Sequence, residues 1–352
     1  MAAEKRILIV GPSWVGDMVM AHSLIQLLGE RHRGALIDVL APAWSRPLLD
    51  RMPGVRAAID MPVGHGELAL GERMRLGESL RGQYDQAIVL PNSLKSSLVP
   101  FFAGIRTRTG WRGEMRFWLL NDIRLLNKKR YPLMVQRFNA LAFAADFANP
   151  VPAPFPVLQV RAEGIPDLLA RFGLNTRRPV LALCPGAEFG PAKRWPEGHY
   201  GAVAAAAVAR GWQVWVFGSA NDRAVAEALV AGAGEAAEHC HILAGETALA
   251  EAIDLLSVAG AVVSNDSGLM HIAAALGRPL VALYGPTSPG FTPPLAKAVE
   301  ILSIPVDCGP CFQRECPKGH QKCLVDIAPG QVLDALERLP QPVAVAGDGE
   351  PR

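Results

Sequence analysis

The sequence predicts an α/β protein with two domains, each built on a parallel β-sheet. Its 352 residues exceed the roughly 100–200 residues of one ordinary domain. Short apolar runs alternate with longer segments of helical spacing, which is typical of βαβ units. The alternation stops at residues 149–166, where five prolines disfavour helix and sheet, and then starts again. We therefore expect domains at 1–160 and 161–330, followed by a C-terminal tail at 331–352.

The composition restricts the class of protein. Hydrophobic residues make up 50% of the chain, which predicts a large core and argues against disorder. A net charge of +2 gives no general attraction for nucleic acid, so we expect no nucleic-acid partner. The apolar run at 7–10 is too short for a secretory signal, and the alanine-rich stretch at 202–209 is too short to span a bilayer. These features predict a cytoplasmic protein.

Each half of the chain has its own set of elements. In the first half, apolar runs predict strands at 5–10, 35–40 and 86–90, and the spacing of Met18, Leu24 and Leu28 predicts a helix at 17–30. In the second half, the same reasoning predicts strands at 180–184, 213–217, 261–264 and 280–283. The helices that we expect there cover 197–210, 221–233, 248–259 and 267–276.

Every predicted strand of the second half ends in a loop of small residues. Carboxyl ends of parallel strands form the ligand-binding edge of an open α/β sheet. Glycine and serine let backbone N–H groups approach an anion, and a following helix N-terminus adds partial positive charge. Ordinary βα turns also favour these residues, but four such loops on one edge predict a nucleotide-diphosphate site. The loop residues that we single out are Gly186, Gly218, Ser219, Ser267, Gly268 and Thr287.

The loop at 11–17 follows the first strand and opens the first helix. It departs from the dinucleotide fingerprint because Ser13 stands where the second glycine belongs. Asp17 falls near the helix start, where the helix dipole favours a carboxylate. Two interpretations therefore stay open for Asp17, a first-turn residue or an exposed general base.

A basic pair and an acidic loop lie near the predicted diphosphate edge. Lys193 and Arg194 follow the first strand of the second half, and either cation can offset charge on a diphosphate leaving group. The chain has no D-x-D pair for a divalent ion, so protein cations are the expected stabilisers. Asp266 is expected to bond a hydroxyl or orient its loop, and His271 either supports the helix or donates to a phosphate. A solvated pair is the alternative for the two cations.

Residues 104–130 are strongly basic. Eight cations oppose only two anions there, and aromatic residues are interleaved with them. Such a stretch is often a solvated face, but in a nearly neutral chain it predicts an anionic partner. Nucleic acid, membrane phospholipid and a phosphorylated glycolipid all fit the charge, and no nucleic-acid recognition motif is present.

Four of the six cysteines crowd into one short segment. Cys308, Cys311, Cys316 and Cys323 lie within 308–323, together with His320. Zinc sites use paired cysteines two to four residues apart, and only the first pair has that spacing. We therefore expect free thiols that pack as small apolar side chains and no bound metal, with a metal site on these four cysteines as the alternative.

Taken together, these motifs resemble the ADP-heptose:lipopolysaccharide heptosyltransferases. The matching segments run in order across nearly the whole chain, at 11–17, 41–44, 90–93, 110–116, 184–196, 265–271 and 283–286. The resemblance implies a GT-B fold, in which two Rossmann-like, doubly wound domains face a central cleft. The first domain would take the acceptor and the second the nucleotide sugar.

The resemblance also implies a reaction and its partners. The reaction is the inverting, metal-independent transfer of L-glycero-D-manno-heptose from ADP-heptose to the first heptose of the lipopolysaccharide inner core, with no cofactor. The partners would be ADP-heptose, a phosphorylated inner-core acceptor and, peripherally, the inner face of the cytoplasmic membrane.

Residue roles follow from the same resemblance and from the loops described above. Asp17 matches the family's catalytic base, and Lys193 matches the lysine at the donor diphosphate. The expected donor-binding residues are Gly186, Lys193, Arg194, Gly218, Ser219, Asp266, Ser267, Gly268, His271 and Thr287. The expected acceptor-binding residues are Ser13, Trp14, Asn92, Lys95, Arg106, Arg112 and Arg116.

Other functions remain open at this point. Another sugar-nucleotide enzyme of the same fold, such as an epimerase or a related heptosyltransferase, would use the same diphosphate edge but would leave the basic stretch without a role if it had no lipid acceptor. A metal- or redox-binding module would use the cysteines at 308–323. A dinucleotide oxidoreductase is disfavoured because the glycine fingerprint is missing.

Overall fold

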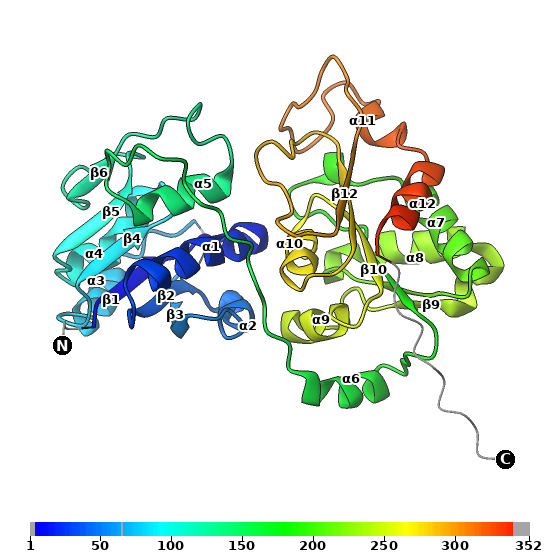
Figure 1. The fold of residues 1–352 in the computed structure, drawn as a ribbon, viewed down its shortest axis with the longest axis horizontal. Helices are drawn as coiled ribbons and strands as arrows, with labels where there is room; N and C mark the ends of the chain where they lie inside the picture. The colour runs from blue at the N-terminus through cyan, green and yellow to red at the C-terminus, as the bar shows by residue number, and fades with distance from the viewer. Residues whose placement is uncertain (1–3, 65, 341–352) are drawn as a thin grey trace. The chain divides into compact units, whose positions relative to one another are not determined.

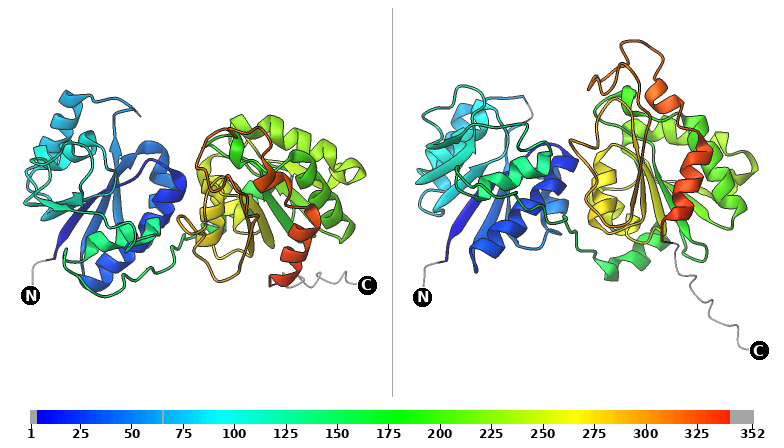
Figure 2. Two further views of the ribbon diagram at one scale, coloured as in Figure 1. Left: turned by 90° about the horizontal axis from the view of Figure 1, so that it is seen from above. Right: turned by 45° about the horizontal axis from the view of Figure 1, so that its top comes forward.

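A computed structural model describes residues 4–64 and 66–340 of the chain. The chain divides into two compact units, Met1–Gln159 and Val160–Arg352 (Figure 1). The division falls one residue before the limit that the sequence analysis expects. Figure 2 shows helices on both faces of the sheet in each unit.

The first unit contains a parallel sheet that has six strands among its described residues. The spatial order of the strands is β3-β2-β1-β4-β5-β6. On β1, Ile7, Leu8 and Ile9 are all fully buried, so both faces of the sheet are covered, as the continuous apolar run predicts. The strands are β1 (Arg6–Val10), β2 (Leu36–Pro42), β3 (Val55–Met61), β4 (Gln86–Val89), β5 (Thr107–Trp111) and β6 (Asp122–Arg124).

Helices cover this sheet in two groups. One group packs together around α1 and α5, and the other around α3 and α4. Leu8 and Val10 of β1 belong to the apolar cluster that also contains Val99 of α4, so the α3 and α4 group covers that face. The helices are α1 (Val15–Arg31), α2 (Arg46–Leu49), α3 (Leu70–Ser79), α4 (Leu98–Phe102) and α5 (Met134–Asn139).

The second unit repeats this plan. Its described residues form a second six-stranded parallel sheet, in the order β12-β11-β10-β7-β8-β9. Its strands are β7 (Val180–Cys184), β8 (Gln213–Val216), β9 (Cys240–Ile242), β10 (Ala261–Asn265), β11 (Leu280–Tyr284) and β12 (Val299–Ser303). Its helices are α6 (Ile165–Arg171), α7 (Glu197–Ala209), α8 (Arg223–Gly232), α9 (Leu249–Leu256), α10 (Gly268–Ala275), α11 (Lys322–Val325) and α12 (Pro329–Arg338).

The strand order creates one switch point in each sheet. In the first unit the chain builds outward from β1 to β3 and then returns to add β4 on the other side of β1. In the second unit the same reversal places β10 beside β7. Loops that leave two neighbouring strands in opposite directions open a crevice at their carboxyl ends, which is where ligands bind in such sheets.

The predicted buried strands are confirmed to within two residues, and the predicted helices are present. The first helix starts at Val15, two residues earlier than expected, and the helix expected at 221–233 opens with a short 3-10 turn, Ala220–Asp222. The sequence analysis did not identify β3, β5, β6, β9 or β12. These strands are short or carry polar residues, so they lack the apolar run that marks a buried strand.

The end of the chain differs from the expected tail at 331–352. Residues 329–338 form α12, which buries Val332 and Ala335 in the core of the second unit. The apolar spacing of these residues on one helical face explains why the segment folds onto the sheet. The rest of the predicted tail, at 341–352, lies outside the described residues.

The proline-rich segment lacks helix and strand over most of its length, as predicted. Residues 151–161 form neither helix nor strand. The backbone N–H of Val157 donates to Nδ1 of buried His22 on α1 at 2.9 Å, and Gln159 N donates to the Arg51 carbonyl at 2.8 Å. Pro166, expected in the linker, instead lies in the first turn of α6, where proline is tolerated because that turn needs no N–H donor.

Candidate active site

An ion pair lies at the carboxyl ends of β7 and β10, at the switch point of the second sheet. Lys193 follows β7 and Asp266 follows β10, and the Lys193 Nζ lies 2.6 Å from the Asp266 Oδ2. The Thr287 hydroxyl, after β11, donates to the same carboxylate oxygen at 2.6 Å. The loops of three neighbouring strands therefore meet on one buried carboxylate, which confirms that the carboxyl edge gathers these three residues.

The Lys193 ammonium is oriented by more than one partner. It donates to the Asp266 carbonyl at 3.3 Å, and it lies 4.9 Å from the centre of the Phe189 ring. Its side chain is 13% exposed, against 5% for that of Asp266. An ammonium held in this way can move little, so its charge is directed toward the edge of the sheet before any ligand binds.

Arg194 belongs to a second network at the same edge of the sheet. Its guanidinium donates to Asp222 at 3.3 Å, and the backbone N–H and hydroxyl of Ser219 donate to the other oxygen of Asp222 at 2.9 and 2.8 Å. Asp222 therefore caps the 3-10 turn that opens α8 and also holds Arg194. The sequence analysis did not single out Asp222, although an acidic residue three positions after a serine is a capping-box signal.

Two predicted donor-binding glycines have a steric role in this network. A Cβ on Gly186 would collide with the Asp222 carboxylate, and a Cβ on Gly218 would lie 2.8 Å from the Asp222 Cβ. Glycine at both positions therefore lets Asp222 fill the space between the loops after β7 and β8. The small residues of these loops are required by packing, whether or not their N–H groups also face a ligand.

The start of α10 is built around Ser267 and Asn265. Ser267 is the N-cap, and its hydroxyl accepts from the Met270 N–H at 3.4 Å. Buried Asn265 donates to the Pro185 carbonyl at 2.6 Å and accepts from the Trp195 N–H at 3.2 Å, so it ties the loops after β7 and β10 together. The N–H groups of Gly268 and Leu269, which precede Met270 in the first turn, are left for an anion.

His271 lies one turn into α10 and is 5% exposed. Burial lowers its pKa to about 4, so its imidazole is neutral at pH 7. A neutral ring can still donate one hydrogen bond but contributes no charge to the site.

The switch point of the first sheet brings together the loops after β1 and β4. Asp17 is the third residue of α1 and is partly exposed, and Ser13 and Trp14 are exposed in the loop before it. Asn92 is exposed and Lys95 is half-buried in the loop after β4. The structure therefore gathers these five predicted residues at one edge.

Arg116 was expected to contact the acceptor, but the structure buries it, with 2% exposure. Its Nη1 donates to the Pro91 carbonyl at 2.7 Å and to the hydroxyls of Ser96 and Ser97 at 3.2 Å each. Its Nη2 donates to the Trp111 carbonyl at 2.6 Å. The guanidinium is thus hydrogen-bonded to the chain's own loops, so Arg116 holds the loops after β4 and β5 in place from the interior of the first unit.

The other cations of the basic stretch separate into two groups. Arg108, Arg124 and Arg130 donate to main-chain carbonyls of neighbouring segments. The exposed cations that form neither an ion pair nor a side-chain hydrogen bond among the described residues are Arg106, Arg112, Lys128 and Lys129. Arg106 and Arg112, two of the predicted acceptor-binding residues, therefore remain accessible.

The four clustered cysteines are free thiols, each half-buried. The Cys308 Sγ lies 3.9 Å from Nε2 of His320. Across residues 4–64 and 66–340, no group of three or more His, Cys, Asp or Glu side chains has the arrangement of a metal site.

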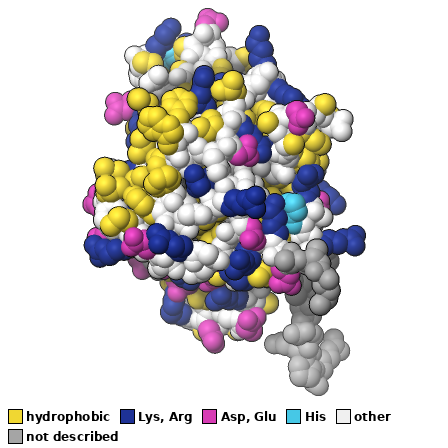
Figure 3. Space-filling model, turned by 90° about the vertical axis from the view of Figure 1, so that its left-hand side faces the viewer, with side chains coloured by type: hydrophobic (Ala, Val, Ile, Leu, Met, Phe, Trp, Pro, Cys, Tyr) yellow, Lys and Arg dark blue, Asp and Glu magenta, His cyan; other side chains and the backbone are white. Residues whose placement is uncertain are grey.

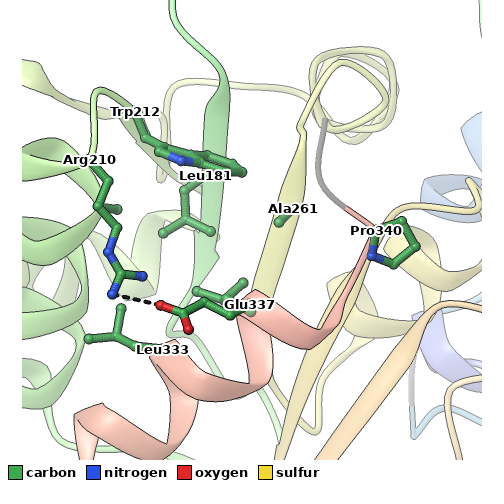
Figure 4. Close-up of a pocket in the computed structure, with 9 residues that line it drawn as sticks. Leu181, Arg210, Trp212, Ala261, Leu333, Glu337 and Pro340 are labelled. Atoms are coloured by element: carbon green, nitrogen blue, oxygen red, sulfur yellow. Dashed lines mark ion pairs between the residues drawn. The ribbon is translucent and has the colours of Figure 1, made fainter. Parts of the chain in front are cut away.

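A pocket of about 180 Å³ lies in the second unit, away from the carboxyl edge of its sheet (Figure 4). Its wall includes Leu181 and Ala261, which lie near the starts of β7 and β10, and the Arg210–Glu337 ion pair of 2.9 Å borders it. Its position at the amino ends of the strands separates it from the loops at the carboxyl edge. We therefore assign it no part in the site.

Comparisons with known proteins show the family to which the chain belongs. The family model of glycosyltransferase family 9 (heptosyltransferase) matches residues 73–322 of the chain. The chain is 50% identical over 341 residues to lipopolysaccharide heptosyltransferase 2 of Escherichia coli (strain K12), covering 95% of this chain and 98% of the relative. It is 52% identical to lipooligosaccharide heptosyltransferase 2 of Haemophilus influenzae, covering 95% of this chain and 99% of the relative.

A solved structure extends the comparison to the fold. The structure of E. coli ADP-heptose LPS heptosyltransferase II matches with a TM-score of 0.84 at 49% identity, covering 94% of this chain and 97% of that one. The chain, which contains two parallel six-stranded sheets, matches that protein along nearly its whole length, and this confirms the expected GT-B fold class. Family and fold agree: the chain belongs to glycosyltransferase family 9, the heptosyltransferases.

Proposed function

We propose that this glycosyltransferase transfers L-glycero-D-manno-heptose from ADP-heptose to the first heptose of the lipopolysaccharide inner core, with inversion and without a metal. The observation that carries the proposal is the Lys193–Asp266–Thr287 cluster at the switch point of the second sheet. The near-complete coverage of relatives named heptosyltransferase 2 supports heptose and an inner-core acceptor as the substrates.

The second unit binds the donor in this proposal. Lys193 and Arg194 offset the negative charge that builds on the ADP leaving group, which is the electrostatic role of a metal in other enzymes. Ser267, Gly268 and the N-terminus of α10 face a phosphate, because the unpaired N–H groups there favour an anion. Asp266 keeps Lys193 directed at the diphosphate, and neutral His271 donates a hydrogen bond. The remaining donor-binding loop residues are Gly186, Gly218, Ser219 and Thr287.

The first unit binds the acceptor. Asp17 is the general base that takes the proton from the attacking hydroxyl, and as a carboxylate it accepts that proton at neutral pH. Ser13, Trp14, Asn92 and Lys95 contact the sugar. Arg106 and Arg112 attract inner-core phosphates, and Arg116 holds the loops in place.

The reaction is a single displacement at the anomeric carbon of the donor heptose. The acceptor oxygen forms the new glycosidic bond while the bond from that carbon to the diphosphate oxygen breaks. The proton goes to Asp17, and the electron pair of the broken bond leaves with ADP beside Lys193. Attack from the face opposite ADP inverts the anomeric centre.

The acceptor also suggests where the enzyme works. We place its activity in the cytoplasm, at the inner face of the cytoplasmic membrane, because a lipid-linked inner core is held in that bilayer. No helix in the described part of the chain is long and apolar enough to cross a membrane. The contact with the bilayer is therefore expected to be peripheral.

A coupled assay of ADP release tests the proposal. The enzyme receives ADP-heptose with acceptors that carry no heptose, one heptose or two heptoses. We expect ADP release only with the one-heptose acceptor, and the product should gain one heptose mass. Conversion of ADP-heptose into a different nucleotide sugar without any acceptor would instead establish an epimerase.

A further inference from the structure

The loop at 112–121, between β5 and β6, exposes large apolar side chains to solvent. Trp118 is 89% exposed, Met115 81% and Phe117 55%, and Leu125 just after β6 is 68% exposed. Trp118, Met115 and Leu125 are the most exposed large hydrophobic side chains among the described residues. Because water disfavours such a group of side chains, a cluster of them marks a surface that contacts something apolar.

The fold holds these side chains outward. Arg116 is the buried residue of the loop, and its hydrogen bonds to Pro91 and Trp111 pin the loop to the sheet. Met115 and Phe117, on either side of it in the chain, are both exposed. Gly113 packs so closely against the Asn92 backbone that a Cβ would collide with the Asn92 carbonyl oxygen. Met115 and Phe117 are therefore exposed on a loop that is held firmly against the sheet.

Free cations belong to the same part of the first unit. Arg112 opens the loop, and its N–H donates to the Arg124 carbonyl at 2.7 Å, which places the start of the loop beside the end of β6 and Leu125. Asn121, at the end of the loop, donates to the Arg106 carbonyl at 2.8 Å. Lys128 and Lys129 follow Leu125 in an exposed turn.

The acidic residues of this region are already engaged. The Glu114 carboxylate accepts from the Leu94 N–H at 2.7 Å, and Asp122 pairs with Arg124 at 2.7 Å. The cations that remain for an external partner are Arg106, Arg112, Lys128 and Lys129. Figure 3 views the end of the first unit where Figure 1 draws β6 and α4, and it shows hydrophobic side chains gathered together with Lys and Arg side chains around them.

We propose that this surface docks the enzyme on the surface of an anionic phospholipid bilayer. We call it the docking surface, and it consists of Met115, Phe117, Trp118, Leu125, Arg106, Arg112, Lys128 and Lys129. Tryptophan favours the boundary between acyl chains and headgroups because its ring is apolar and its N–H is polar. Cations around such an anchor are attracted to anionic headgroups. The positive charge of the docking surface favours anionic over neutral lipids as its binding partner.

The docking surface adjoins the proposed acceptor-binding loop. Arg116 lies between Met115 and Phe117 in the chain and donates to the Asn92 side chain at 3.3 Å and to the Ser93 carbonyl at 3.3 Å. Docking would therefore hold the loop of Asn92 and Lys95 close to the headgroup layer, where a lipid-linked acceptor presents its sugar. This consequence rests on the proposed function, whereas the lipid contact itself does not.

Co-sedimentation of the full chain with vesicles tests the docking surface without donor or acceptor. One set of vesicles contains phosphatidylcholine alone, and the other also contains phosphatidylglycerol. We expect binding to the mixed vesicles that weakens with salt, and little binding to the neutral ones. Met115→Ser with Trp118→Ser should weaken binding about tenfold or more, since two large apolar side chains lose their place in the interface. Lys128→Ala with Lys129→Ala should weaken it roughly tenfold on anionic vesicles only.

A matched control removes exposed apolar side chains from the second unit. Ile301 and Val325 are each 40% exposed, and the Ile301→Ser, Val325→Ser variant should bind vesicles like the natural sequence. Circular dichroism should show each variant folded. Equal binding of the natural chain to both vesicle types, or unchanged binding of the Met115 and Trp118 variant, overturns the proposal. Trp118-dependent self-association without vesicle binding overturns it in favour of a protein partner.

Activity measurements separate the docking surface from the proposed reaction. With a lipid-free acceptor oligosaccharide, the Met115 and Trp118 variant should keep the natural rate of ADP release. With the acceptor embedded in anionic vesicles, its rate should fall about tenfold, in line with its binding. If the natural enzyme transfers heptose to neither acceptor, the proposed function fails, while the vesicle binding still decides the docking surface.

Discussion

Asp17 and Lys193 lie at the switch points of the two sheets, and each has a position that suits one half of the proposed reaction. Asp17 is the third residue of α1 and remains partly exposed. Lys193 is held by Asp266 at 2.6 Å and is mostly buried. A base needs access to a hydroxyl, whereas a cation that stabilises a leaving group acts best when its orientation is fixed in advance.

Replacing Asp17 by Asn tests the base. The amide cannot take a proton, so we expect kcat to fall by about 10²- to 10⁴-fold while the KM for ADP-heptose stays the same. The variant should remain folded, because asparagine has nearly the same size and shape as aspartate. Steady-state kinetics and denaturant unfolding check both expectations. Full turnover by this variant contradicts the assignment.

Replacing Lys193 by Ala tests the stabilisation of the leaving group. We expect kcat to fall by about 10²- to 10³-fold, because a charge directed at the departing ADP is lost. Lys297→Ala removes an exposed lysine from the same unit and should leave the kinetics unchanged. Normal turnover of the Lys193 variant in the ADP-release assay would remove this residue from its proposed role.

At the scale of elements, buried polar side chains determine how the loops at the sheet edges are arranged. Asn265 ties the loops after β7 and β10 together, and Asp222 joins those after β7 and β8. In the first unit, Arg116 does the same for the loops after β4 and β5. A buried polar group stays stable only when its hydrogen bonds are satisfied, so these side chains restrict the loops to few conformations.

Replacing Arg116 by Ala should therefore disturb both stability and acceptor binding. We expect the free energy of unfolding to fall by about 2–4 kcal/mol, since several buried acceptors lose a charged donor. The KM for the acceptor should rise more than the KM for the donor. Arg116→Lys should not rescue the enzyme, because one ammonium cannot reach acceptors on both sides of the guanidinium.

Arg112→Ala is the matched control for this prediction. Its side chain is exposed, so we expect the free energy of unfolding to change by less than about 0.5 kcal/mol. Equal stability of the Arg112 and Arg116 variants contradicts the role of Arg116 in holding the loops. Urea unfolding followed by tryptophan fluorescence gives the comparison.

The start of α10 has a pH-dependent stability. Burial lowers the pKa of His271 to about 4, against about 6.5 in an unfolded chain. Because the unfolded chain binds this proton first, the stability that neutral His271 contributes is complete above pH 6.5 and is lost progressively as the pH falls toward 4.

His271→Gln tests this dependence. Between pH 7 and pH 5 we expect His271 alone to account for a loss of about 2 kcal/mol in the free energy of unfolding of the natural protein. The glutamine variant should lose that much less over the same range. Denaturant unfolding at the two pH values measures the difference, and equal pH dependence in both proteins would show that the imidazole does not resist protonation in the folded state.

At the scale of the whole molecule, the proposed chemistry relies on protein cations in place of a divalent ion. We expect the same rate of ADP release with and without excess chelator, because Lys193 and Arg194 supply the positive charge. Measurement before and after prolonged incubation with the chelator provides the comparison. A strict requirement for added magnesium contradicts this prediction.

Much of this fold is predictable from the sequence because its buried strands are uniformly apolar. Val180–Cys184 and Ala261–Asn265 lie between layers of helices, so every side chain faces a core and the apolar run stands out. The edge strand β6, with the sequence Asp-Ile-Arg, has no such run, because one of its sides faces no further strand. Its presence depends on pairing with β5, which local sequence does not reveal.

The candidate site divides in the same way. The small-residue loops and the cations Lys193 and Arg194 follow from the sequence, since the carboxyl edge of a parallel sheet brings such loops together. The interior role of Arg116 does not follow, because an arginine within a basic, aromatic segment resembles its exposed neighbours in sequence. Asp222 was missed for a related reason. It follows β8, whereas Arg194 and Gly186, which it contacts, follow β7, so the contacts form only when these two strands pair.

The sequence by itself determined the repeated α/β plan, and it predicts a division near residue 160 and a ligand-binding edge on each sheet. These properties depend on hydrophobic periodicity and on the chain direction of parallel strands, which are local or follow from one topological rule. Only the tertiary structure decided which charged side chains face solvent and which are buried. That choice separates Arg116 from Arg112 and leaves Trp118 exposed, because it depends on which distant carbonyls and hydroxyls a side chain can reach once the strands are paired.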